Sequence, residues 1–517
     1  MSYNRRAVLR GSLAASAALT LGAAAPAQVL RGRPSAGWGV QTGDVTSSSG
    51  LVWVRSDRPA RMIVETSASD SFRRTHRWHG PLLGPGTDFT GTTALRGLPA
   101  GEQIHYRVTL ADPDDPRRAG EPVYGTFRTA PGLRRPSGVR FLWSGDIAGQ
   151  GWGINPDIGG FRAYEEMRRL DPDFFLCSGD TVYADGPLAP SVTLPDGRVW
   201  RNVTVEEKSK VAETLAEYRG NFRYNLLDDN VRRFNAQVPT VVQWDDHEVR
   251  NNWYPGQLLD DARYTEKDAD VLAGRALRAF SEYFPVSTLP VGGREGRMHR
   301  VVRYGPLLDV FVLDMRSYRN ANSPGRQADD TTGILGAEQL AWLKRELSRS
   351  RAVWKVLAAD MPLGLVVPDG ATNVEAVAQG DPGVPLGREL QIADLLRFIK
   401  RRRITGTLWL TADVHHTSAQ HYAPERAAFK DFAPFWEFVS GPLAAGGFPA
   451  NALDGTFGPE RVFVRAPERA NVSPMESPQY FGEVDIDGGS GELTVRLRAE
   501  GGMVLFSKVL QPGRVGQ

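Results

Sequence analysis

Cysteine is almost absent from this chain of 517 residues, which contains only Cys177. A single thiol cannot form an intrachain disulfide, and it cannot build a cysteine-rich zinc site. Cys177 lies in an apolar run before Ser178, and we expect it to be a buried core thiol. Disulfide scaffolds and cysteine–zinc folds are therefore excluded.

An excess of one charge is also missing, since 62 Lys and Arg residues stand against 60 Asp and Glu residues. A near-neutral chain gives no reason to expect nucleic-acid binding. The one dense basic run, 400–403, is predicted to be a solvated helix end, where cations suit the helix dipole. Residues 145–153 are rich in glycine but lack the G-K-[ST] of a nucleotide-binding loop, which disfavours a nucleotide binder.

The apolar stretch 11–25 is too short and too rich in alanine to predict a stable transmembrane segment. It follows the run N-R-R-A-V-L-R (4–10) and precedes small residues suited to cleavage near Ala27. This pattern is typical of a twin-arginine export signal over residues 1–27. Removing Arg5, Arg6 and Arg10 with it leaves 59 basic and 60 acidic residues. We expect the twin-arginine export machinery to deliver the folded protein to the periplasm, cell envelope or exterior.

Two or three domains are expected from the length. Short alternating runs between residues 36 and 130 predict an all-β sandwich of the immunoglobulin or fibronectin type, with strands at 50–55, 61–66, 104–110 and 124–129. The segment 130–138 is rich in proline, glycine and arginine, and it is predicted to be a linker.

Strands alternate with helices from residue 138 to 513, which predicts an α/β domain. The strands are expected at 140–143, 174–177, 240–243, 308–313, 354–358 and 408–410. Apolar residues recur at helical spacing in 161–170, 340–347 and 392–399, and 205–233 is expected to form a helix or helix pair. A final hairpin is expected from 481–486 and 492–498.

Acidic residues stand where several predicted strands end. Asp146 and Asp180 both follow Ser-Gly, 34 residues apart, with one strand–helix–strand unit between them. The two are therefore expected at neighbouring strand ends of a parallel sheet, at the edge where α/β folds place their sites. Tyr183 follows on the same loop, where it is either a packed aromatic or, beside a trivalent ion, a phenolate ligand.

The remaining strand ends carry further acids and imidazoles. The run W-D-D-H-E contains Asp245, Asp246, His247 and Glu248, Asp360 follows the strand at 354–358, and Asp413, His415 and His416 follow the strand at 408–410. Adjacent carboxylates repel each other unless a cation offsets them, so a metal cluster is favoured over capped turns. Neighbouring histidines on an extended chain point to opposite faces, so one of the pair is expected to face the metal.

These motifs carry a resemblance to the PhoD-type alkaline phosphatases and phosphodiesterases of the calcineurin-like metallophosphoesterase superfamily. The resemblance rests on the export signal, the sandwich, S-G-D-T-V-Y-A-D-G, W-D-D-H-E-V-R-N-N-W, L-D-M-R-S-Y-R and T-A-D-V-H-H-T. It implies a four-layer α/β/β/α metallophosphatase sandwich after the N-terminal domain. It also implies a dinuclear or trinuclear metal site, with Fe³⁺ and Ca²⁺ as the expected ions.

The resemblance also implies individual roles. The metal ligands would be Asp146, Asp180, Tyr183, Asp246, Asp360, Asp413 and His415, with Asp180 bridging two ions and His247 acting as the catalytic histidine. Replacing neutral ligands by aspartate makes the second site oxygen-rich, which suits calcium better than zinc. One position departs from the family pattern, because Asp146 stands where a cysteine is usual. The identity of the first metal is therefore open.

The function implied is an exported phosphoric ester hydrolase, in which a metal-bound hydroxide attacks a phosphomonoester or phosphodiester. Arg250, Arg316 and Asn252 are candidates for contact with the substrate phosphate, but each arginine can equally form a salt bridge to the nearby acids. A phospholipase-D-like or teichoic-acid-cleaving phosphodiesterase remains the alternative. The loops 187–201 and 323–335 are the segments expected to decide between these substrates. A non-catalytic secreted binding protein is a more remote reading.

Overall fold

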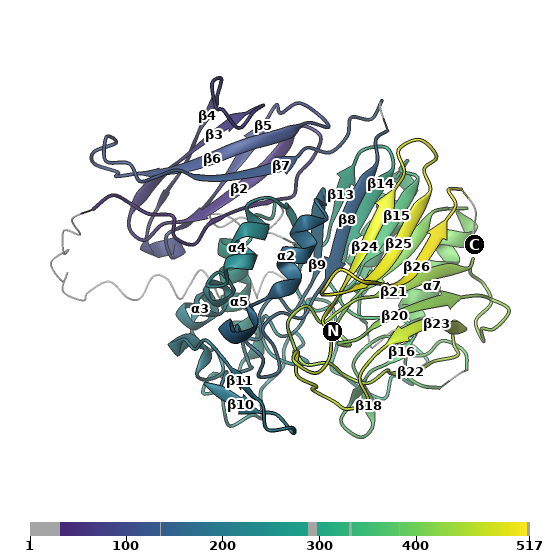
Figure 1. Cartoon of the computed structure of the whole chain (residues 1–517). Helices are drawn as coiled ribbons and strands as arrows, with labels where there is room; N and C mark the ends of the chain where they lie inside the picture. The colour runs from purple at the N-terminus through teal and green to yellow at the C-terminus, as the bar shows by residue number, and fades with distance from the viewer. Residues whose placement is uncertain (1–31, 135, 288–296, 330–332, 382, 514–517) are drawn as a thin grey trace.

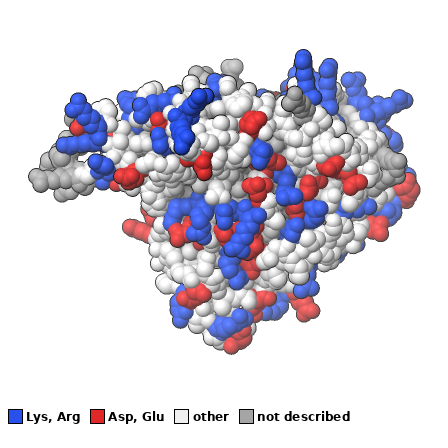
Figure 2. Space-filling model, turned by 45° about the horizontal axis from the view of Figure 1, so that its top comes forward, with Lys and Arg blue, Asp and Glu red and all other residues white. Residues whose placement is uncertain are grey.

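The computed structural model describes residues 32–134, 136–287, 297–329, 333–381 and 383–513, so the predicted export signal lies outside the described residues. Two sheets of a small sandwich lie beside a larger body of two facing sheets with helices on its outer sides (Figure 1). Lys and Arg side chains are interspersed with Asp and Glu over the face shown in Figure 2. Within the described residues, no helix combines the length and apolar character needed to cross a bilayer.

The small sandwich contains seven strands around an apolar core. They are β1 (Val40–Gly43), β2 (Ser49–Arg55), β3 (Ala60–Ser67), β4 (His76–Leu83), β5 (Thr90–Arg96), β6 (Gln103–Ala111) and β7 (Val123–Arg128), with the short helix η1 (Pro85–Thr87) before β5. β4, β3, β6 and β7 form one sheet, and β1, β2 and β5 form the other side. The sequence predicted β2, β3, β6 and β7. It missed β1, β4 and β5. The run of β4, H-R-W-H-G-P-L-L, is mostly exposed and lacks clean alternation.

The small sandwich is joined to the large body through a shared sheet. Its strand β1 pairs in parallel with β12 (Thr240–Gln243) through Gly43 and Thr240. A Cβ on Gly43 would lie 2.5 Å from the Pro285 carbonyl oxygen, so this crossing requires glycine. The Asp44–Arg300 ion pair, 3.0 Å long and buried, braces the same junction.

The first large sheet carries most of the strand-end motifs. Its strands outside the small sandwich are β8 (Val139–Ser144), β9 (Phe174–Ser178), β12 (Thr240–Gln243), β24 (Tyr480–Ile486), β25 (Leu493–Ala499) and β26 (Val504–Leu510). The full order is β26-β25-β24-β8-β9-β12-β1-β2-β5. β8, β9 and β12 run parallel, as their positions before the acidic motifs predicted.

The second large sheet has the order β13-β14-β15-β19-β21-β20-β23. Its strands are β13 (Arg300–Tyr304), β14 (Leu308–Val312), β15 (Trp354–Ala358), β19 (Thr407–Thr411), β20 (Thr417–Tyr422), β21 (Phe435–Val439) and β23 (Pro459–Arg465). Short pairs lie in the connecting loops: β10 (Ser191–Thr193) with β11 (Val199–Arg201), β16 (Leu365–Val366) with β22 (Ala452–Leu453), and β17 (Pro368–Asp369) with β18 (Asn373–Val374).

The two large sheets pack face to face, and helices cover their outer faces. Apolar side chains from both sheets meet in one core, among them Phe141, Leu176, Val310 and Leu408. The first sheet is covered by η2 (Pro156–Ile158), α2 (Arg162–Arg169), η3 (Glu206–Lys208), α3 (Leu215–Asn225), α4 (Asp229–Asn235) and α5 (Ala269–Tyr283), and the second by α6 (Gly336–Arg349) and α7 (Glu389–Arg401). The predicted four-layer α/β/β/α architecture is confirmed.

Local sequence explains why the helices covering the first sheet begin where they do. Thr214 and Glu217 form a capping box at the start of α3, and Asp228 accepts two backbone N–H bonds at the start of α4. The strands between the layers are buried on both faces and therefore read as continuous apolar runs. Their carboxyl ends converge at one edge of the paired sheets.

Candidate metal centre

The acidic residues leave the sheets in tight turns at that edge. Asp146 follows β8, Asp180 follows β9, and Asp413 and His415 follow β19. All four have positive φ, between 48° and 69°, a left-handed conformation that is uncommon outside glycine. Such turns cluster at functional sites because the surrounding structure must hold them in place. They aim the side chains across the strand ends instead of along them.

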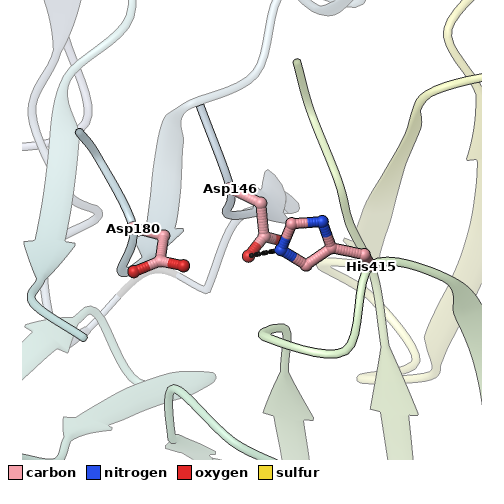
Figure 3. A group of neighbouring side chains, drawn as sticks. All are labelled: Asp146, Asp180 and His415. Atoms are coloured by element: carbon pink, nitrogen blue, oxygen red, sulfur yellow. Dashed lines mark ion pairs between the residues drawn. The ribbon is translucent and has the colours of Figure 1, made fainter. Parts of the chain in front are cut away.

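Two overlapping groups of ligand atoms result. The ligand atoms of Asp146, Asp180 and His415 lie within 4.8 Å of one another, and so do those of Asp180, Asp246 and His247. Figure 3 shows the first group, with Asp146 and His415 converging from different strands and Asp180 beside them. The His415 Nε2 lies 3.4 Å from an Asp146 oxygen. Asp180 belongs to both groups, which is the position a bridging carboxylate requires.

Tyr183 is enclosed by the first group. Its hydroxyl lies 2.8 Å from His415 Nε2, and its ring lies over the His247 ring with the centroids 4.2 Å apart. A Cβ on Gly149 would lie 2.2 Å from the Tyr183 ring, so the backbone itself covers the aromatic group. Burial raises the pKa of Tyr183 well above its ordinary value, and the carboxylates of Asp180 and Asp146 add to this.

Several carboxyl groups of the cluster are buried close together, and they repel one another when ionised. Burial, followed by repulsion from neighbouring carboxylates, raises the pKa values of Asp146, Asp180, Asp360 and Asp413 well above the ordinary range. Among the described residues, neither oxygen of Asp146 and neither oxygen of Asp360 has a hydrogen-bond partner. Buried carboxylates of this kind are stabilised by bound cations. The donor set therefore fits metal ions.

The Arg316 guanidinium occupies the centre of the remaining carboxylates. It is fully buried, and its nitrogens lie 3.0 Å from Glu375, 3.3 Å from Asp360, 3.5 Å from Asp413 and 3.6 Å from Asp246. Arg316 Nε also donates to Asp245 at 2.5 Å. Of the two roles that the sequence left open, the contacts are those of a salt bridge. Asp360 and Asp413 thus lie around Arg316, outside the two compact ligand groups.

His247 has a carboxylate partner that sequence reasoning did not single out. Its Nδ1 lies 2.7 Å from Asp185 Oδ1, while Asp185 Oδ2 accepts the Asn251 backbone N–H at 2.8 Å. Burial alone would lower the pKa of His247, but Asp185 and Asp246 outweigh burial and raise it to about 10. His415 behaves in the opposite way, because burial lowers its pKa to about 4. The surroundings therefore favour a protonated imidazole at His247 and a neutral one at His415.

The two other predicted phosphate contacts lie in different places. The Arg250 guanidinium donates to Gln257 at 3.2 Å and lies over the Tyr264 ring. Its backbone N–H donates to the Asp246 carbonyl at 2.8 Å, but among the described residues its side chain contacts no predicted metal ligand. The Asn252 backbone N–H donates to Asp246 at 2.5 Å. With its amide nitrogen turned toward Glu375, Asn252 donates to that carboxylate at 2.8 Å. Asn252 thus braces the cluster, whereas the Arg250 guanidinium points away from it.

Most of the chain matches the models of one protein family. Residues 141–497 match the family model described as PhoD-like phosphatase, and residues 22–131 match the model of its N-terminal domain. The chain belongs to the PhoD-like phosphatase family. It is therefore a phosphoric ester hydrolase.

One curated relative resembles the chain in sequence, and two solved structures share its fold. The chain is 28% identical over 437 residues to alkaline phosphatase D of Bacillus subtilis (strain 168), covering 79% of this chain and 69% of the relative. Its fold matches a solved structure of PhoD with a TM-score of 0.70 and 21% identity, over 94% of this chain and 90% of the other. A purple acid phosphatase, PPD1, from yellow lupin (Lupinus luteus) seeds matches with a TM-score of 0.59 and 13% identity, over 93% and 74% of the two chains.

Three acidic residues that support this PhoD-like site were not assigned a role from the sequence. Asp185 and Glu248 stand inside quoted motifs, but only the fold shows their partners. Glu248 accepts Thr181 N–H and O–H at 2.6 Å and Asp245 N–H at 2.8 Å, which ties two strand-end turns together. Glu375 comes from a loop after β18 whose sequence, T-N-V-E-A, carries no recognisable signal.

Proposed function

We propose that this PhoD-like phosphatase is an exported, metal-dependent enzyme that hydrolyses phosphomonoesters, phosphodiesters or both. The observation that carries the proposal is the position of Asp180, whose carboxylate belongs to both groups of ligand atoms. A shared carboxylate holds two ions at the short separation that two-metal phosphoesterases use. When bound, the ions would polarise the phosphoryl group and supply a nucleophile at neutral pH.

Ferric iron with calcium is the proposed pair, because the two parts of the site differ in chemistry. Tyr183, His415 and Asp146 offer a phenol, an imidazole and a carboxylate, which suit a trivalent ion. Asp246, Asp360 and Asp413 offer only oxygen, which suits calcium, and a bound calcium would share these carboxylates with the Arg316 guanidinium. Asp146 stands where the family pattern has a cysteine, so metal analysis decides which ion occupies the first position.

The side chains around the substrate position supply proton transfer and orientation. Asp185 raises the pKa of His247 above its ordinary value and so favours the protonated imidazole, in which Nδ1–H donates to Asp185 and Nε2–H is left to face the site. As the ester P–O bond breaks and a water oxygen forms the new P–O bond, the leaving oxygen needs a proton. His247 is placed to give it, and Asp185 stabilises the cation beforehand.

One of the two loops predicted to decide substrate preference forms a hairpin. The β10–β11 hairpin fills the segment 187–201, which the sequence singled out as a determinant of substrate choice. The preference between monoesters and diesters, including a phospholipase-D-like or teichoic-acid-cleaving activity, is assigned to such loops because the ligand set is the same for both reactions.

The decisive test combines metal content with turnover. Purified protein is analysed for iron and calcium, and p-nitrophenyl phosphate and bis-p-nitrophenyl phosphate are assayed before and after EDTA. We expect both metals, loss of activity on chelation, and loss of metal and activity together in Asp180→Asn. Asp70→Asn, in the exposed turn between β3 and β4 of the small sandwich, is the matched control and should change neither. Full turnover by metal-free protein would refute the two-metal assignment.

Export is tested separately. Arg5→Lys and Arg6→Lys together should retain the protein in the cytoplasm, because the twin-arginine route reads the arginine pair. Cell fractionation of the variant and the parent chain, in a host with and without a functional twin-arginine translocase, measures the outcome. Delivery that does not depend on the arginine pair would remove the export proposal and leave the catalytic one untouched.

A further inference from the structure

The imidazole of His415 is fixed by a backbone group on its far side. Its Nδ1 lies 2.6 Å from the Gly446 carbonyl oxygen. A carbonyl only accepts, so Nδ1 carries the proton and Nε2 is left with a free lone pair. Nε2 faces Asp146 at 3.4 Å and the Tyr183 hydroxyl at 2.8 Å. The position of Gly446 therefore sets both the tautomer and the aim of this predicted ligand.

Gly446 is itself held by two side chains from other parts of the chain. Asn471 Oδ1 accepts the Trp152 indole N–H at 2.7 Å. A Cβ on Gly446 would lie 1.8 Å from Asn471 Oδ1 and 2.9 Å from Trp152 Nε1. The Asn471–Trp152 hydrogen bond thus presses directly on the Gly446 backbone, and no side chain fits between them.

Asn471 connects three loops at this point. Its Nδ2 donates to the Gln150 carbonyl at 3.0 Å, in the segment that covers Tyr183. The next residue, Val472, exchanges backbone hydrogen bonds of 2.8 and 2.9 Å with Gly447. Asn471 adopts φ 52°, a left-handed conformation that places its amide between the two other loops.

We propose that Asn471 is a positioning residue for the metal centre, acting on His415 through Gly446. The amide fixes the carbonyl that orients the ligand, and through Gln150 it also fixes the backbone over Tyr183. The inference rests on the proposed function, because it takes His415 as a metal ligand. Asn471 itself touches neither a predicted ligand atom nor the substrate position in any contact described here.

The test measures retention of metal instead of activity alone. Asn471→Gly removes the amide without backbone strain, since glycine tolerates a positive φ. Purified variants are equilibrated with graded EDTA, and bound metal is quantified by elemental analysis. We expect Asn471→Gly to lose metal at about tenfold lower chelator concentration than the parent protein, the low end of the effect of supporting groups on metal affinity.

Asn202→Ala is the matched control. Asn202 accepts the Trp200 indole N–H at 2.7 Å and the Gly153 N–H at 2.8 Å, and it donates to Gly151 and Ala189. It therefore braces the same loop with the same kind of bonds but has no described contact with Gly446. We expect Asn202→Ala to lower stability while it retains metal within about twofold of the parent. Equal loss of metal in both variants would overturn the proposal, because general loosening would then explain the effect.

A double-mutant cycle identifies the route. Gly446→Ala should weaken metal retention in the parent chain, because its Cβ collides with Asn471. In the Asn471→Gly background, the vacated space should make the same substitution less damaging. Strictly additive losses would show that Asn471 does not act through Gly446. Parent protein without stoichiometric metal would instead overturn the proposed function, which keeps the two failures distinguishable.

Discussion

Substitution of Arg316 should lower the free energy of unfolding more in the metal-free protein than in the metal-loaded protein. Arg316 is fully buried and serves five carboxylates, of which Glu375 is 3.0 Å away and Asp246 is 3.6 Å away. Taking one partner out of a buried ion pair costs about 3–5 kcal/mol, because the other charges stay buried without compensation. We expect Arg316→Met to lower the free energy of unfolding of metal-free protein by about this amount.

The metal-loaded protein should lose less, since bound cations compensate the same carboxylates. Urea unfolding of both forms, followed by circular dichroism, gives the two differences. Arg316→Lys keeps the charge but lacks the planar fork that reaches several carboxylates, so an intermediate loss is expected. Arg250→Met is the control, because Arg250 contacts Gln257 and Tyr264 instead of the cluster.

The outcome also decides between the two roles that the sequence left open for Arg316. A structural counter-ion predicts a large loss of stability in the metal-free state and poor metal loading. A phosphate contact predicts a raised KM with little change in stability. Metal-free Arg316→Met protein as stable as the parent would refute the reasoning from burial and ion pairing.

Three further substitutions test separate parts of the structure. Gly149→Ala should displace the Tyr183 ring, because the new Cβ would lie 2.2 Å from that ring. The substitution should shift or bleach any tyrosinate-to-iron absorption band in visible spectra, and an unchanged band would contradict the contact. Asp185→Asn should lower the pKa of His247 and cut kcat about 100-fold while metal content stays constant, as measured by steady-state kinetics and elemental analysis. Burial raises the pKa of Glu389 from 4.5 to about 8, so the folded protein holds a proton there that the unfolded chain releases, and the free energy of unfolding should fall as pH rises through this window. Glu389→Gln should remove that fall, by up to about 1.4 kcal/mol for each unit of pKa shift, and should match the parent near pH 4; equal pH profiles of urea unfolding would contradict it.

The strand ends of the catalytic domain were predictable because local pattern and position agree there. The apolar run before Asp146 and the one before Asp180 are β8 and β9, which pair in parallel as expected. The run before Asp245 is β12, with the predicted bounds Thr240–Gln243. Continuous apolar runs that end in Ser-Gly-Asp leave few alternatives, since buried parallel strands are the elements that read this way.

The supporting residues could not be predicted, because their roles come from contacts between distant segments. Glu375 meets Arg316 across 59 residues, and Asp185 meets His247 across 62. Neither partner is visible in a sequence window, whose periodicity reports only which face of an element is buried. Strand β4 was missed for a different reason: its exposed basic residues and Pro81 obscure the alternation on which strand prediction depends.

The place of β24 in the first large sheet has a consequence for synthesis of the protein. β8, which carries Asp146 at its end, is flanked by β9 on one side and by β24 on the other, with Trp143 opposite Gly482. A ribosome therefore releases the first catalytic strand long before its second neighbour exists. Until residues 480–486 emerge, that edge of the sheet stays open to wrong pairing. We therefore expect the nascent chain to need protection at this edge during most of its translation, although the last predicted metal ligand, His415, is made before β24.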